Sequence, residues 1–304
     1  MSKLVVILGP TASGKTSLAT NLAFRLKAEI ISADSRQIYK GMDIGTGKDL
    51  HEYIVNNENI PYHLINILEP SENYSVYAFK KDFHDVYNSL NSNKKLSILC
   101  GGTGLYIESV LLNYQMVNIP PDEVLRKKLE TYSLSDLINK IKDTKKIDYD
   151  INYHTTKRRI IRSLEIYQNQ KYSNISPRND TSINPIVFGI DIEREIILKK
   201  IQLRLEERLK TGMIEEVSEL INNGYSLDRL KYFGLEYKFI GEYLYNNITF
   251  SEMKEKLNYA INRFSKKQMT FFRRMEKRGI KINWIKLNNI DLVNQKINDY
   301  LDER

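Results

Sequence analysis

Short apolar runs alternate with longer amphipathic segments in the first hundred residues. The apolar runs cover residues 4–8, 29–32, 64–68 and 96–100 and have the length of buried strands. The segments that begin at residues 16 and 76 have apolar positions at helical spacing instead. Buried strands that alternate with helices are typical of a parallel sheet with helices on both faces. The pattern therefore predicts an α/β domain.

The pattern changes after residue 112. Residues 120–172 contain charged segments of helical periodicity and no strand-like run, and residues 174–185 are polar, contain two prolines and are expected to form a loop. The segment IVFGIDI at residues 186–192 then predicts one more strand, and residues 193–301 are mostly helical in pattern. We therefore predict a P-loop α/β core with a helical C-terminal part, comprising residues 1–112 and 186–304. Residues 113–185 are expected to form a helical insertion domain.

Composition narrows the class of protein only a little. The 304 residues are 41% hydrophobic and 28% charged, and 46 basic against 38 acidic residues give a net charge of +8. A polyanionic partner fits this charge, but compositional drift in a lysine-rich chain explains it equally well. Cys100 is the single cysteine, so no disulfide can form within the chain and a zinc site is not expected. Neither a leader peptide nor an 18-residue apolar run is expected from the pattern, so a cytoplasmic protein without membrane contact is expected. A monomer is expected as well.

A phosphate-binding motif lies between the first predicted strand and the first predicted helix. The pattern G-x-x-x-x-G-K-[ST] is formed by Gly9, Gly14, Lys15 and Thr16. Backbone N–H groups and the helix N-terminus would surround phosphate oxygens, Lys15 would add a full charge, and the Thr16 hydroxyl could bind Mg²⁺. The motif does not by itself select a reaction. The expected phosphate-binding residues are Gly9, Pro10, Thr11, Ala12, Ser13, Gly14, Lys15 and Thr16.

The segment ADSRQIY restricts the possible reactions more than the phosphate-binding motif does. A P-loop NTPase would need an acid at the end of another apolar strand to hold Mg²⁺, but the run that ends at Cys100 continues as GGTGLYI. An acid does end the run IISAD, at Asp34, and Ser35, Arg36 and Gln37 follow it. Asp34 could be a metal ligand or a strand-end cap. A carboxylate beside a phosphate loop, followed by groups that can bind a heterocycle edge, would also suit deprotonation of an acceptor.

Five segments in the same order resemble the signature series of tRNA dimethylallyltransferases. They are GPTASGKT, ADSRQIYKGMDIGT, GGTGLYI, KRRIIRSLEI and NRFSKKQMTFFRR, and they extend over nearly the whole chain. The resemblance implies transfer of a dimethylallyl group from dimethylallyl diphosphate to the exocyclic amine of the adenosine 3′-adjacent to a tRNA anticodon, with release of diphosphate. It also implies a Mg²⁺ cofactor at Thr16. The catalytic residues that it implies are Asp34 as general base, with Lys15 and Thr11.

The same resemblance implies residues that contact the tRNA anticodon stem-loop. The residue pattern alone leaves open that the basic segments are solvated helix faces. Either Arg204 or Arg208 is implied to reach the diphosphate, although pairing with neighbouring glutamates is an alternative. The implied tRNA-binding residues are Asp34, Ser35, Arg36, Gln37, Thr103, Arg158, Arg159, Ile160, Ile161, Arg162, Lys267, Gln268 and Arg273.

Phe264 is expected to be buried. It belongs to an apolar stripe of helical spacing with Leu257, Ile261, Phe271 and Met275.

Some residues depart from the family pattern. Asp49 follows Lys48 where bacterial members usually have proline, Thr155 replaces a usual asparagine, and GLEY at residues 234–237 replaces a shorter Gly-Tyr-Lys version. Three other functions stay open at this point. They are a small-molecule P-loop kinase that uses ATP, a prenyltransferase of free adenine nucleotides, and an RNA-binding protein with a vestigial P-loop.

Overall fold

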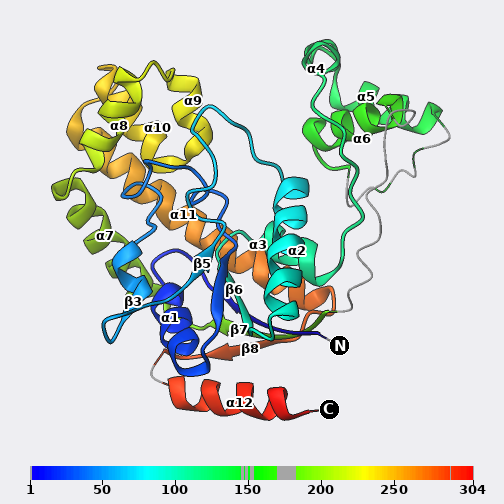
Figure 1. Ribbon diagram of the computed structural model, residues 1–304. Coiled ribbons are helices and arrows are strands. Elements are labelled where there is room, and N and C mark those ends of the chain that lie inside the picture. Colours follow the sequence, from blue (N-terminus) through cyan, green and yellow to red (C-terminus); the bar gives the residue numbers. More distant parts are fainter. Residues whose placement is uncertain are drawn as a thin grey trace. The chain divides into compact units, whose positions relative to one another are not determined.

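A sheet of six parallel strands forms the centre of the larger of two units (Figure 1). The computed structural model describes residues 2–144, 147, 150, 154–169, 183–287 and 289–303, and the larger unit comprises Met1–Tyr114 and Asp180–Arg304. Every neighbouring pair of strands in the sheet is parallel, which confirms the expected α/β class and brings all carboxyl ends to one edge. In spatial order the strands are β5 (Tyr62–His63), β2 (Glu29–Ser32), β6 (Ser97–Gly101), β1 (Ser2–Leu8), β7 (Ile183–Ile190) and β8 (Ile282–Ile285).

Helices cover both faces of the sheet because β1 is apolar at successive positions. Leu4, Val6 and Leu8 belong to the core on one face, and Val5 and Ile7 belong to the core on the other. The first core is completed by α2 (Val76–Ser92), α3 (Gly104–Leu111) and the end of α11 (Phe250–Lys277), and the second by α1 (Lys15–Leu26) and α12 (Ile290–Asp302).

A third core joins the loop after β2 to a group of helices in the C-terminal part of the chain. Ile38, Tyr39 and Met42 of this loop are buried against these helices. The loop therefore has a fixed position relative to the helices. The helices are α7 (Arg194–Lys210), α8 (Met213–Asn222), α9 (Leu227–Phe233), α10 (Leu235–Leu244) and the first part of α11, and the same unit contains η1 (Leu50–Tyr53) and the short strands β3 (Ile54–Val55) and β4 (Glu58–Asn59).

The prediction of a sheet strand at residues 64–68 is wrong. The sheet strand is β5, two residues earlier, because Leu64 and Asn66 have φ of 61° and 57°, which are incompatible with an extended chain. Residues 66–68 instead donate backbone hydrogen bonds to Gln37 and Ile38. The apolar run therefore supports the loop after β2 rather than the sheet.

Two further strand predictions need correction. Residues 183–185, expected in a loop, are the start of β7, and the rest of that expected loop lies outside the described residues. Pro185 is tolerated there because β8 pairs with β7 only from Val187 onward. The strand β8 was missed because Ile282–Ile285 is only four residues long and follows a long helix.

The smaller unit, Gln115–Asn179, is helical where the structure describes it. The insertion was expected at residues 113–185. Ile160, Ile161 and Leu164 pack with residues of the other two helices in a separate apolar core. Within this unit the Glu165 carboxylate is fully buried and accepts hydrogen bonds from Arg126 at 2.9 and 3.0 Å. The helices are α4 (Glu123–Glu130), α5 (Leu134–Asp143) and α6 (Lys157–Asn169).

A search for a membrane span finds none in the parts of the chain that are described. None of their helices is both long enough and apolar enough to cross a bilayer.

The buried His84 ring on α2 makes the stability of the fold depend on pH. It is 3% exposed, neither ring nitrogen has a hydrogen-bond partner among the described residues, and burial lowers its pKa to about 4. Between about pH 6.5 and 4 the unfolded chain binds a proton that the folded chain does not, so stability is lost as the pH falls. We expect a loss of roughly 2 kcal/mol between about pH 7.5 and 5.

The His84→Leu variant should lose this part of the pH dependence, as measured by urea unfolding at both pH values. The exposed His51 provides the control, since the His51→Ala variant should lose as much stability between the two pH values as wild type does. Equal losses in wild type and His84→Leu would contradict this assignment.

Candidate functional site

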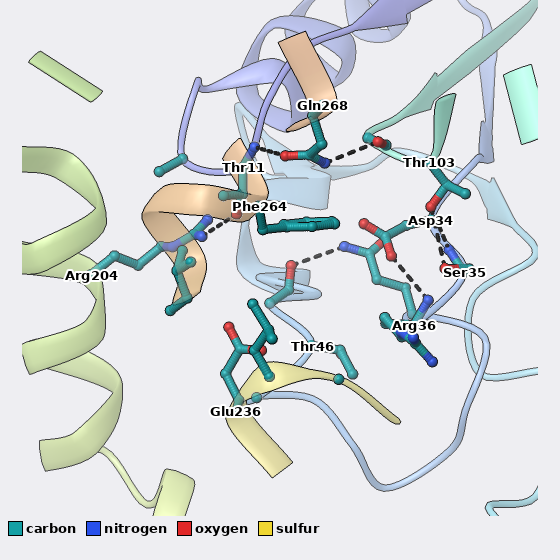
Figure 2. Close-up of a pocket in the computed structure, with 18 of the residues that line it drawn as sticks. Thr11, Asp34, Ser35, Arg36, Thr46, Thr103, Arg204, Glu236, Phe264 and Gln268 are labelled. Atoms are coloured by element: carbon teal, nitrogen blue, oxygen red, sulfur yellow. Dashed lines mark hydrogen bonds between the residues drawn. The ribbon is translucent and has the colours of Figure 1, made fainter. Parts of the chain in front are cut away.

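A cavity of about 690 Å³ opens at the carboxyl ends of β1, β2 and β6. Its walls are the phosphate loop after β1, the segment after β2, the GGTG turn after β6, and residues of α7, α10 and α11 (Figure 2). A ligand pocket at this edge is expected for an open parallel sheet, because loops from neighbouring strands converge there. All of the lining residues belong to the larger unit.

The phosphate loop has the shape that the motif predicts. Gly14 has φ of 84°, in the region that glycine favours, and it is followed directly by the first residue of α1. Thr11, Lys15 and Thr16 line the cavity. Ser13 is fully buried and packs on Gly9, where an added Cβ would lie 2.6 Å from the serine Oγ. Gly9 and Ser13 therefore shape the loop. The side chains of Thr11, Lys15 and Thr16 present hydroxyl groups and a charge to the cavity.

The two candidate arginines of α7 have different partners. Arg204 donates a hydrogen bond to the hydroxyl of Thr11 in the phosphate loop. Arg208 donates to both carboxylate oxygens of Asp49, at 3.0 and 2.9 Å, and packs on Gly47. Arg204 is therefore the arginine that reaches the phosphate loop. Arg208 holds the segment around Asp49, which is one of the positions that depart from the family pattern.

Cations are close together in this part of the cavity. Burial and the neighbouring Arg208 lower the pKa of Arg204 to about 10, and burial lowers the pKa of Lys15 although Asp34 opposes this shift. Glu206, a possible neutralising partner of these arginines, binds a lysine of α11 at 3.1 Å instead. An anion bound between Lys15 and Arg204 would relieve both the desolvation and the repulsion.

Asp34 lies two residues after the end of β2 and lines the cavity. Its Oδ1 accepts a hydrogen bond from the Arg36 backbone N–H at 3.0 Å, which fixes the carboxylate in an Asx-type turn. The Thr103 hydroxyl accepts from the Ser35 N–H at 3.0 Å and donates to the Ser35 Oγ at 3.3 Å. The structure therefore brings the segment after β2 and the GGTG turn together around the carboxylate.

Gln37 lies in the cavity wall but its amide is engaged by the protein. Its Oε1 accepts from Ser32 at 3.1 Å, its Nε2 donates to the Gly47 carbonyl at 2.9 Å, and it is 8% exposed. The side chain is therefore placed to hold two loops together. This differs from the direct tRNA contact that the resemblance implies.

Gln268 of α11 joins the two loops on the other side of the cavity. Its Oε1 accepts from the Thr11 N–H at 2.8 Å and its Nε2 donates to the Gly102 carbonyl at 2.9 Å (Figure 2). The approach of α11 is close, since a Cβ at Gly104 would lie 2.3 Å from the ring of Phe271. The glycines of the GGTG turn are thus explained by packing, which the sequence did not reveal.

The prediction that Phe264 is buried with the apolar stripe of α11 is wrong. The stripe contains the fully buried Phe272 instead, whereas Phe264 is 45% exposed and lines the cavity. At 100° per residue, Phe264 lies only about 20° from the buried Leu257 around the helix, so its exposure is due to the cavity at this point of α11 and not to its position around the helix axis. Phe271 also lines the cavity, with the Arg274 guanidinium 4.0 Å from its ring centre.

Sequence reasoning missed the cavity residues of the GLEY segment. Glu236 lines the cavity, and burial raises its pKa although two arginines oppose this. The next residue, Tyr237, donates a 2.6 Å hydrogen bond to Glu216, whose carboxylate also accepts from the N–H groups of residues 43–45 at 2.6 to 2.9 Å. The ring of Tyr237 packs on Gly45, where an added Cβ would meet it at 2.7 Å. The only sequence signal was that GLEY departs from the family pattern.

The implied tRNA-binding residues of α6 fall into two groups. Ile160 and Ile161 are 0% and 4% exposed, so their side chains form the core of the smaller unit rather than a contact surface. Arg162 donates to Glu165 and, at 2.7 Å, to a backbone carbonyl. Arg158 and Arg159 are exposed, and so are Lys267 and Arg273 on α11 of the larger unit.

Metal binding would depend on oxygen donors of the cavity. The hydroxyl of Thr16 and the carboxylates of Asp34, Asp49 and Glu52 line it, and these are ligands that suit a hard cation. Within the described part of the chain, no three His, Cys, Asp or Glu side chains form a metal-binding group. Burial raises the pKa of Cys100 to about 12, so this thiol is neither a thiolate ligand nor a nucleophile at neutral pH.

The parallel sheet, the phosphate loop and the acid after β2 define a P-loop α/β protein with a helical insertion. The sequence model described as IPP transferase matches residues 37–275, and one described as isopentenyl transferase matches residues 2–63. The chain belongs to this family, the tRNA dimethylallyltransferases, which are also called IPP transferases.

Relatives and solved structures match almost the full length of the chain. A protein of Azobacteroides pseudotrichonymphae, named tRNA dimethylallyltransferase 1, is 46% identical over 97% of each chain. The tRNA dimethylallyltransferase 2 of Bacteroides fragilis is 44% identical over 98% of each chain. The tRNA isopentenylpyrophosphate transferase of Bacillus halodurans aligns with a TM-score of 0.71 at 30% identity, over 99% of this chain and 97% of its own.

The contacts of Gln268 predict a defect in phosphate binding. Gln268→Met keeps the length of the side chain but leaves the N–H of Thr11 without its partner, which should cost about 1–3 kcal/mol of unfolding free energy. Inorganic diphosphate should bind about tenfold more weakly in titration calorimetry, a change of about 1.4 kcal/mol. The exposed Gln202 gives the control Gln202→Met. If Gln268→Met bound tRNA more weakly but diphosphate as tightly as wild type, the result would instead support the direct contact between Gln268 and tRNA that the family resemblance implies.

Proposed function

We propose that this chain transfers a dimethylallyl group from dimethylallyl diphosphate to the exocyclic amine of the adenosine 3′-adjacent to a tRNA anticodon. Diphosphate is the second product. The main support is that one cavity contains both the phosphate loop and the carboxylate of Asp34. Membership of the tRNA dimethylallyltransferase family supports the transfer of this group to tRNA.

The diphosphate part of the donor binds at the phosphate loop. The loop amides, the N-terminus of α1, Lys15 and Arg204 oppose the negative charge that grows on the departing diphosphate. Arg204 has this role rather than Arg208, because Arg208 is paired with Asp49. The Thr16 hydroxyl would hold a Mg²⁺ ion, which when bound would supply further positive charge beside the leaving group.

The adenine amine approaches from the side of Asp34. This amine is a weak nucleophile because its lone pair is delocalised into the ring, so removal of a proton as the new bond forms assists attack. Asp34 accepts that proton, and its hydrogen bond from the Arg36 N–H keeps the carboxylate in place. The base must leave its stack to enter the cavity, which is easier for a loop nucleotide than for one in a duplex.

Exposed cations of the chain bind the RNA backbone. Arg158 and Arg159 on α6, and Lys267 and Arg273 on α11, are exposed residues that can contact phosphates. The two isoleucines of α6 act through the core of the smaller unit instead. A kinase is disfavoured because β6 ends in the GGTG turn, without an acid to hold a nucleotide-bound metal.

The decisive experiment incubates the protein with unmodified tRNA, dimethylallyl diphosphate and Mg²⁺, followed by mass spectrometry of the tRNA nucleosides. We expect a dimethylallyl adenosine and diphosphate in equal amounts, and little product when Mg²⁺ is chelated. Asp34→Asn should lower turnover by on the order of 10² to 10⁴ with nearly unchanged tRNA affinity. Turnover of this variant within a few-fold of wild type would refute the role of Asp34, and consumption of ATP with product would favour the kinase.

A salt titration separates the tRNA enzyme from an enzyme of free nucleotides. The double variant Arg159→Ala with Arg273→Ala should raise the Michaelis constant for tRNA and reduce the slope of log affinity against log salt by roughly 1.5 in total, or 0.7 to 0.9 for each lost contact. The donor Michaelis constant should stay nearly constant. Lys81→Ala with Lys256→Ala removes the same charge at two other surface positions and should leave the slope unchanged. Efficient prenylation of free AMP would overturn the tRNA assignment.

A further inference from the structure

The ring of Phe264 is an apolar surface inside a cavity whose walls also contain many charged side chains. Figure 2 shows the ring between Thr11 and Arg204 on one side and Asp34 on the other. These residues are the proposed binding site of the diphosphate and the proposed base, so the atoms that react must lie between them. Phe264 is 45% exposed in the absence of ligand, and a bound apolar group would cover this surface.

The position of Phe264 is fixed by its neighbours on α11. Gln268 lies one turn further along the same face and binds the phosphate loop at 2.8 Å and the GGTG turn at 2.9 Å. Phe271 packs on Gly104 without space for an added Cβ. The turn of helix that carries Phe264 is therefore held against both loops, which fixes the backbone position from which the ring extends.

Other apolar side chains continue this surface. Ile261, Phe271 and Leu105 also line the cavity, whereas Lys15 and Arg204 lie at its phosphate-binding part. A ligand with a charged diphosphate head and a short apolar chain matches a cavity that offers both cations and apolar side chains.

We propose that Phe264 is a specificity-determining residue that covers the five-carbon chain of the donor during transfer. This inference rests on the proposed function. The ring excludes water from the allylic carbons and occupies the space that a longer prenyl chain would need. Its face also stabilises the positive charge that develops on these carbons, by a cation–π interaction.

The chemistry explains why water must be excluded. The bond between the first allylic carbon and the diphosphate oxygen breaks, and its electron pair leaves with the diphosphate. In transfer, the amine nitrogen forms the new bond to this carbon and its proton passes to Asp34. In hydrolysis, a water oxygen forms the bond instead, its proton is released, and dimethylallyl alcohol is the product. An aromatic ring that covers this carbon therefore favours transfer to the amine over hydrolysis.

The test measures two products from the same reaction. Wild type, Phe264→Ala, Phe264→Leu and Phe264→Tyr are incubated with tRNA, Mg²⁺ and dimethylallyl diphosphate, and both prenylated tRNA and dimethylallyl alcohol are quantified. The second measurement replaces the donor with geranyl diphosphate, which has ten carbons. Phe250→Ala is the matched control, because Phe250 lies on the same helix, is also 45% exposed and does not line the cavity.

Phe264→Ala should raise the ratio of alcohol to prenylated tRNA about tenfold, a change of about 1.4 kcal/mol in the competition between water and amine. It should also use geranyl diphosphate, which wild type should reject. Phe264→Leu should show both effects to a smaller extent, whereas Phe264→Tyr and Phe250→Ala should behave as wild type. The Michaelis constant for tRNA should stay within about twofold in all variants, since the ring contacts the donor.

Two failures can be told apart. If wild type forms no prenylated tRNA from dimethylallyl diphosphate, the proposed function is wrong, whatever the variants do. If wild type forms it and both Phe264→Ala and Phe264→Leu keep the wild-type product ratio and reject the longer donor, the role of Phe264 is wrong and the function stands. A fall in turnover without a change in the ratio also overturns the role.

Discussion

Helix α11 packs directly on the turn that follows β6, and the rest of the site depends on this contact. A Cβ at Gly101 would lie 2.2 Å from the carbonyl oxygen of Ala33, and one at Gly104 would lie 2.3 Å from Phe271. Two loops and a helix can approach so closely only because these positions have no side chain. The carboxylate of Asp34, the residue after Ala33, and the apolar face of α11 therefore face the same cavity.

The charges of the cavity depend on this arrangement as well. Lys15 and Arg204 are held close together where burial lowers the pKa of both. The fold tolerates this because Arg204 donates to Thr11 and because Arg208 has its own partner in Asp49. An anion bound between Lys15 and Arg204 would supply the remaining counter-charge, in agreement with the proposed binding of the diphosphate at this place.

Loops that carry no catalytic group are supported by buried polar contacts. Lys48 is fully buried and binds the backbone oxygen of Tyr39 and the Asp43 carboxylate, each at 2.6 Å. Glu216 binds three successive N–H groups of the same loop and the hydroxyl of Tyr237. Tyr237 of the GLEY segment is thus connected to this loop through the carboxylate of Glu216.

The sequence by itself determined the features that depend on a few neighbouring residues. The phosphate loop, the acid that follows β2 and the α/β class followed from local spacing, because the loop conformation and the apolar pattern of a strand depend on neighbouring residues. Only the tertiary structure decided that Phe264 enters the cavity, that Gln268 binds Thr11 across 257 positions of sequence, and that Arg204 rather than Arg208 reaches the phosphate loop. Periodicity gives the face of a helix but not the neighbour that covers it, and the identity of that neighbour depends on how distant segments pack together.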